Sequence, residues 1–109
     1  MSYSKGDVIL LPYPFTDMKT TKVRPAVVVS SEDSRYNDVF VAPITSRTNN
    51  LNAGEFIMTD WSAAGLNVAS AVKRGCVLVD IGLIKKKVGA FSKRDITALN
   101  KALRLWLEL

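Results

Sequence analysis

The stretch SKRDITALNKALRLWL, residues 92–107, decides the architecture, because it combines helical periodicity with a helix start signal. Ser92 and Asp95 have the spacing of a capping box, in which the serine caps backbone N–H groups and the acid reaches back. The apolar residues then recur every three or four positions, as on one face of a helix: Ile96, Leu99, Ala102, Leu103, Trp106 and Leu107. This pattern predicts an amphipathic helix from about Lys93 to Leu107.

Upstream of residue 92 the apolar residues form short runs between polar segments. Runs rich in Val, Ile and Leu predict strands at residues 6–11, 26–29, 39–44, 55–59, 68–72 and 77–81. The last two runs form either one bent strand or two, and Gly75 between them could mark a bulge. Several short strands followed by one helix predict a mainly β fold, a small barrel with a helix packed on it. No linker interrupts the pattern, so we expect a single domain over residues 1–109.

The charge and the histidine content restrict the function. Lys and Arg total 15 against 10 Asp and Glu, a formal charge of +5 that favours a polyanionic partner such as nucleic acid. The chain contains no histidine. A Ser-His-Asp triad and a histidine-based zinc site are therefore excluded.

The cysteine content and the hydropathy favour a cytoplasmic protein. Cys76 is the one cysteine, so an internal disulfide is excluded, and its apolar surroundings in the sequence predict an inert core residue. No segment approaches the roughly 18 apolar residues of a membrane-spanning helix. We expect a cytoplasmic protein without a membrane partner.

Four segments together resemble the MazF/PemK/Kid toxin family. They are KGDVILLPYPFTD at 5–17, KVRPAVVVS at 22–30, VAPITS at 41–46 and VGAFS at 88–92, followed by the final helix. The resemblance covers residues 5–107. It implies an SH3-like barrel of the CcdB/Kid/MazF type, usually a homodimer.

The same resemblance implies an activity and a partner. Members of this family cleave single-stranded RNA at short motifs, without a metal or other cofactor. The ribose 2′-OH attacks the phosphodiester and leaves a 2′,3′-cyclic phosphate and a 5′-OH end. An antitoxin with an acidic, partly disordered tail holds such toxins inactive, and together the two form a type II toxin–antitoxin system that controls growth.

The family motifs also suggest catalytic residues. From its position alone, Arg24 is as well explained by a solvated arginine at the start of a strand as by a functional residue. The motif match implies the functional role, a guanidinium fork on the scissile phosphate. We expect this arginine to stabilise the pentavalent phosphorane rather than to transfer a proton. The resemblance implies that Thr45 hydrogen-bonds a phosphate oxygen, with Ser46 supporting it.

Further residues are candidates for binding and orientation. Basic residues near predicted loops are expected to contact RNA: Lys19, Lys22, Lys73 and Arg74. Asp7 could orient Arg24 across neighbouring strands. Asp80 matches the aspartate that ends a late family motif.

That late motif also carries the main departure from the family. Many members have Gln-Ile-Arg-Thr-Ile-Asp, whereas residues 75–80 here read GCVLVD, so Val77 replaces the arginine. This departure leaves open a non-catalytic alternative: an SH3-like binding protein, either a degenerate toxin or a poison of a protein target such as gyrase.

Overall fold

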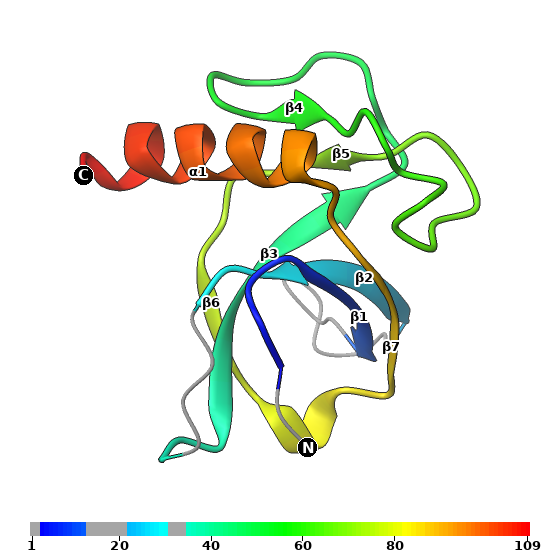
Figure 1. Ribbon diagram of the computed structural model, residues 1–109, viewed down its shortest axis with the longest axis vertical. Coiled ribbons are helices and arrows are strands. Elements are labelled where there is room, and N and C mark those ends of the chain that lie inside the picture. The colour runs from blue at the N-terminus through cyan, green and yellow to red at the C-terminus, as the bar shows by residue number, and fades with distance from the viewer. Residues whose placement is uncertain (1–2, 13–21, 31–34) are drawn as a thin grey trace.

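The computed structural model describes residues 3–12, 22–30 and 35–109. In this part of the chain, seven strands form one antiparallel sheet and a long helix follows them (Figure 1). The elements are β1 (Asp7–Pro12), β2 (Val23–Val28), β3 (Asp38–Thr45), β4 (Phe56–Ile57), β5 (Ala71–Val72), β6 (Val77–Asp80), the 3-10 turn η1 (Ile81–Leu83), β7 (Lys86–Ala90) and α1 (Lys93–Leu107). The predicted mainly β fold with a C-terminal helix is confirmed.

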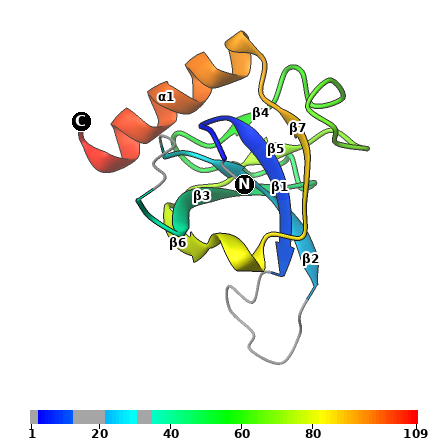
Figure 2. The same ribbon diagram turned by 60° about the horizontal axis from the view of Figure 1, so that its bottom comes forward.

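The sheet curls into a barrel-like shape around β3. Its strand order is β4-β5-β3-β2-β1-β7, and β6 joins β3 outside this path. Helix α1 lies beside β4 and β5 at one end of the molecule, and the β6–η1–β7 segment turns back at the other end (Figures 1 and 2). Described helices include none with the length and apolar character needed to cross a membrane.

Pro43 decides whether the segment after residue 68 forms one strand or two. The carbonyl oxygen of Pro43 accepts a hydrogen bond from the N–H of Lys73, so the proline nitrogen faces the same side of β3. Proline has no N–H to donate to a neighbouring strand. The neighbouring chain therefore pairs with β3 on either side of this position, as β5 opposite Ile44 and as β6 opposite Val41.

The strands predicted from the sequence do not include β7, which begins within a basic run of Lys85, Lys86 and Lys87. The structure pairs Lys86–Ala90 with β1 in an antiparallel register that shifts between Val8 and Ile9. In the strand order β7 lies at one end. Lysine-rich edge strands discourage pairing with other chains, which gives a physical reason for the charge.

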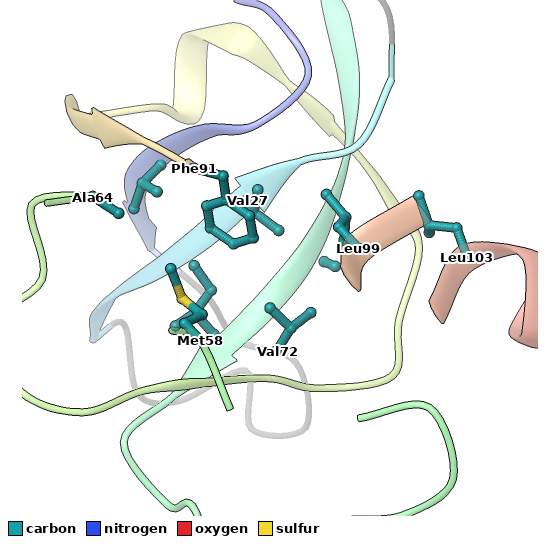
Figure 3. Packing of buried hydrophobic residues seen from close by; sticks show 10 residues of the cluster. Val27, Met58, Ala64, Val72, Phe91, Leu99 and Leu103 are labelled. Atoms are coloured by element: carbon teal, nitrogen blue, oxygen red, sulfur yellow. The ribbon is translucent and has the colours of Figure 1, made fainter. Parts of the chain in front are cut away.

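Two hydrophobic clusters lie on opposite faces of β1 and β2. Alternate residues point to opposite faces of a strand, so Val8 and Val27 pack in one cluster and Ile9 and Val28 in the other. The first cluster joins the sheet to α1, because Leu99 and Leu103 of the helix belong to the same cluster as Met58, Val72 and Phe91 (Figure 3). Burial on both faces explains why residues 26–29 are continuously apolar rather than alternating.

The helix has the predicted bounds, but its capping acid differs from the prediction. Ser92 caps the helix by accepting a hydrogen bond from the N–H of Asp95. The Asp95 carboxylate is buried and accepts from the N–H groups of Thr59 and Asp60, at 2.8 and 2.9 Å, instead of reaching back to Ser92. It therefore fixes the segment after β4 to the start of α1. Cys76, predicted to be in the core, is exposed because it lies in the loop that bends around Pro43.

Candidate functional site

An open groove of about 510 Å³ lies where β2 begins and β3 ends. Its walls come from five parts of the chain. The lining residues are Leu10, Lys22 to Pro25, Ile44 to Arg47, Gly65 to Val68, Ser70 and Val88. The predicted catalytic residues Arg24, Thr45 and Ser46 are therefore brought together, although more than 20 positions separate Arg24 from Thr45 in the sequence.

The register of β2 and β3 accounts for this meeting. The two strands are antiparallel, with Ala26 opposite Pro43. Continuing this register by two residues sets Arg24 opposite Thr45, and residues directly opposite each other share a face of the sheet. The side chains of Arg24 and Thr45 are thus directed to the same face, at the same end of the strand pair.

The Arg24 guanidinium is available to a ligand. Arg24 is the second residue of β2 and is exposed. Across residues 3–12, 22–30 and 35–109, no carboxylate or other acceptor forms an ion pair or hydrogen bond with it. A planar guanidinium that keeps its N–H groups available suits bidentate binding of a phosphate or carboxylate.

Thr45 ends β3 in a tight turn. Its Oγ1 accepts a hydrogen bond from the N–H of Arg47 at 3.1 Å. This bond fixes the hydroxyl oxygen and leaves its hydrogen free to be donated to a ligand. Ser46 follows as an exposed residue of the same turn.

The groove is cationic. Lys22 and Arg47 line it together with Arg24, and no aspartate or glutamate is among the lining residues of the described chain. Such a surface attracts a polyanion through the release of counterions. Arg47 was missed in the sequence analysis, although its place two residues after Thr45 was a usable signal.

Lys73 and Arg74 do not line this groove. The Arg74 N–H donates to the Glu55 carboxylate at 2.9 Å, and Arg74 lines a separate hollow beside Trp106. Partial burial acts to raise the pKa of Glu55, but the backbone N–H groups of Arg74 and Asn52 and the charge of Lys73 outweigh it and lower that pKa. Lys19 lies outside the described residues.

Asp7 and Asp80 have other partners than expected. The Asp7 carboxylate is buried, pairs with Lys87 at 3.2 Å and accepts from the Ser4 N–H. Arg24 is opposite Leu11, at the other end of β1, so Asp7 does not orient it. Asp80 caps η1 by accepting from the Gly82 N–H. Both aspartates serve local structure, and in the described chain no three Cys, Asp or Glu side chains gather as a metal site would need.

Comparison with protein families matches residues 4–107 to the PemK-like, MazF-like toxins of type II toxin–antitoxin systems. The chain belongs to this toxin family. A search of curated proteins gives no match.

Solved structures agree with the fold of this toxin. A mycobacterial endoribonuclease in complex with its cognate antitoxin is similar with a TM-score of 0.76 and 17% identity, over 98% of this chain and 96% of that one. The Mycobacterium tuberculosis toxin MazF-mt6 is similar with a TM-score of 0.73 and 23% identity, over 96% and 98% of the two chains. At these identities the likeness concerns the fold alone.

The toxin has a second, apolar hollow of about 500 Å³ beside the C-terminal half of α1. Phe40 of β3 and Leu107 and Leu109 at the chain end line it, together with the exposed Cys76. Leu78 lies opposite Phe40 in the β3–β6 pair and is also exposed. Apolar side chains gathered on a surface are typical of an interface with another protein.

Proposed function

We propose that this toxin is a metal-independent endoribonuclease that cleaves single-stranded RNA in the groove of Arg24 and Thr45. The observation that carries the proposal is the meeting, in a cationic groove, of a hydroxyl and a guanidinium that has no partner among the described residues. An RNA phosphate matches both groups, because it accepts a bidentate fork and a hydroxyl hydrogen bond at once.

The reaction follows from the chemistry of RNA. The 2′-OH oxygen forms a bond to phosphorus, and the bond from phosphorus to the 5′ oxygen of the next nucleotide breaks. The proton lost by the 2′-OH is balanced by one taken up at the leaving 5′ oxygen. The products are a 2′,3′-cyclic phosphate and a 5′-OH end.

Arg24 acts on the charge that develops in this reaction. Negative charge accumulates on the non-bridging oxygens of the phosphorane, and a preorganised fork stabilises it most in the transition state. Its high pKa makes a guanidinium a poor acid or base. Thr45 donates its hydroxyl hydrogen to the same phosphate, and Lys22 and Arg47 attract the flanking phosphates.

Val77 bears on the non-catalytic alternative. It pairs with Val41 in β6 and is not among the groove residues. Replacement of the family arginine by Val77 therefore removes no group from the groove of the protomer. For this reason we keep the hypothesis that the toxin is an enzyme.

We also propose that two protomers form a C2 dimer and that an acidic antitoxin inhibits the toxin by covering the cationic groove. The apolar hollow beside α1 supplies a surface for self-association. The similarity to an endoribonuclease in complex with its cognate antitoxin supports the second partner. Cytoplasmic mRNA is then the substrate, and its cleavage inhibits growth.

The decisive experiment incubates the purified chain with a long RNA in the presence of EDTA and maps the new ends. We expect 5′-OH and cyclic phosphate ends at a short recurring motif. Binding of RNA with no cleavage, by a chain that folds normally, would establish the non-catalytic alternative instead.

A further inference from the structure

The groove has two walls. The first carries the cations and hydroxyls of β2 and β3, and the second lies between β4 and β5 in the sequence and has groups that suit a ligand other than phosphate. Residues Gly65, Leu66, Asn67, Val68 and Ser70 form this wall. Asn67 is exposed and carries the one amide side chain among the groove residues of the described chain. Its amide forms no hydrogen bond within the described part of the protein, so both its donor and its acceptor are open to a ligand.

Backbone contacts hold this wall in place before any ligand binds. Gly65 has a φ of +90°, and a Cβ there would collide with the carbonyl group of Val88. On the next residue of β7, a Cβ on Gly89 would collide with the Ala64 carbonyl. The two glycines therefore let the backbone of the wall pack directly on β7.

Hydrogen bonds fix the wall on both sides of Asn67. The Leu66 N–H donates to the Trp61 carbonyl at 3.1 Å. The Ser70 hydroxyl donates to the Val68 carbonyl at 2.9 Å, and the Ser70 carbonyl accepts from the Met58 N–H at 2.8 Å. An amide carried by a backbone fixed in this way is preorganised for recognition.

The two walls differ in the part of an RNA that each can bind. The first wall carries the cations of Arg24 and Arg47 and the hydroxyl of Thr45. These groups suit phosphates, which carry no sequence information. An amide suits a base edge, and asparagine makes its best bidentate pair with adenine, donating to a ring nitrogen and accepting from the exocyclic amine. Val68 beside it is exposed and offers an apolar surface to the face of an unstacked base.

We propose that Asn67 is a specificity-determining residue, whose amide reads one adenine of the RNA while Arg24 and Thr45 hold the neighbouring scissile phosphate. This inference rests on the proposed ribonuclease function. It adds to that function the base that the toxin selects and the residue that selects it.

The test compares cleavage of an RNA library with one randomised segment by the wild-type chain and by Asn67→Ala and Asn67→Asp. We expect the wild type to favour adenine at one position and both variants to lose that preference by about 5- to 150-fold. A carboxylate accepts but cannot donate, so Asn67→Asp should shift the preference toward cytosine, whose N4 amine is a donor. Asn37→Asp, an exposed asparagine outside the groove, is the matched control.

Two results overturn the assignment. One is a wild-type pattern without an adenine preference, or with a preference that both Asn67 variants retain. The other is a uniform loss of cleavage at all sequences, which would make Asn67 a structural residue. A second experiment selects, from the same library, the RNA that the Arg24→Ala variant binds. If Asn67 reads a base, this bound RNA should still favour adenine although the variant does not cleave it. The result therefore tests the role of Asn67 separately from the proposed ribonuclease function.

Discussion

Arg24 and Thr45 lie at the same end of the β2–β3 pair, two residues beyond the point where Ala26 is opposite Pro43. Through strand register alone, this relationship places the Arg24 guanidinium and the Thr45 hydroxyl in one groove. Because it depends on strand register, each side chain can be changed with little effect on the barrel. The groove is therefore open to a clean test by substitution.

Removing Arg24 should reduce the cleavage rate far more than RNA affinity. A preorganised donor aimed at the transition state contributes about 2.7–4 kcal/mol, so Arg24→Ala should slow single-turnover cleavage by roughly a hundred- to a thousandfold. Arg24→Lys should restore little, because an ammonium lacks the planar fork. Lys101→Ala, an exposed lysine on α1, is the control. Equal losses in binding and cleavage would reduce Arg24 to one more phosphate contact.

Removing the Thr45 hydroxyl should cost less. A hydrogen bond from an uncharged hydroxyl to an ionised phosphate oxygen contributes about 1.5–3 kcal/mol, so Thr45→Ala should slow cleavage by roughly ten- to 150-fold. Thr45→Ser keeps the hydroxyl that accepts from the Arg47 N–H and should retain most of the rate. A loss as large for the serine variant as for the alanine variant would show that the methyl group, and not the hydroxyl, matters.

The salt dependence of RNA binding should identify which cations touch phosphates. Each phosphate contact with a single strand contributes about 0.7 to the slope of log affinity against log salt. Arg47→Ala should lower that slope by about this amount, because Arg47 lines the groove. Lys73→Ala should leave it unchanged, because Lys73 lies elsewhere, and the opposite ranking would move the RNA path away from the groove.

The Asp60 carboxylate should make stability depend on pH. The Arg94 guanidinium and the Ser92 hydroxyl both donate hydrogen bonds to the Asp60 carboxylate. These bonds, that of Arg94 most of all, hold the pKa of Asp60 below the ordinary value of 3.8. A depressed pKa stabilises the fold above the unfolded value, and this contribution is lost as the pH falls through the folded pKa. Asp60→Asn should therefore be less stable than the wild type at pH 7, with a gap that closes on acidification below about pH 4.

Urea unfolding at pH 7 and at pH 3 measures that gap. Glu108→Gln removes an exposed carboxylate near the end of the chain and serves as the control. A gap for Asp60→Asn that is the same at both pH values would mean that the loss comes from packing and not from the charge.

The end of the chain should mediate self-association. Leu105 is 57% exposed and Leu109 is 83% exposed, so both add apolar surface at the C-terminal end of α1, beside the apolar hollow. We expect the wild type to sediment as a dimer at micromolar concentration and a Leu105→Glu, Leu109→Glu double variant to sediment as a monomer. Thr97→Glu, at an exposed position nearer the start of α1, should remain dimeric. A wild type that is monomeric at this concentration would exclude the dimer.

Local patterns in the sequence predicted the parts of the fold that local physics determines. The bounds of α1 follow from the Ser92 cap and one apolar stripe, and both are visible within 16 residues. The role of Asp95 was mistaken because its partners, Thr59 and Asp60, are distant in sequence. Strand β7 was missed for a similar reason, since its lysines make sense only at the edge of a sheet.

The sequence predicted the catalytic residues of the candidate site better than the residues that surround them. Motif order brought Arg24, Thr45 and Ser46 to attention, and the register of β2 and β3 explains why they meet. Asp7 was expected to reach Arg24, but adjacency of two strands does not fix which ends meet, and the register puts the two residues at opposite ends. Asn67 carries no motif of its own and is distant in sequence from Arg24 and Thr45, so only the folded chain relates it to the groove.

The pairing of β1 with β7 has a consequence for folding during synthesis. Asp7 is opposite Ala90, and Val88 of β7 supplies part of the groove. The barrel therefore closes only when the first and last thirds of the chain meet, a loop closure of high contact order. On the ribosome, where the N-terminal part emerges first, the groove stays incomplete until β7 has also emerged. The toxin therefore acquires its complete site only after β7 has left the ribosome, when an inhibitor can also reach the groove.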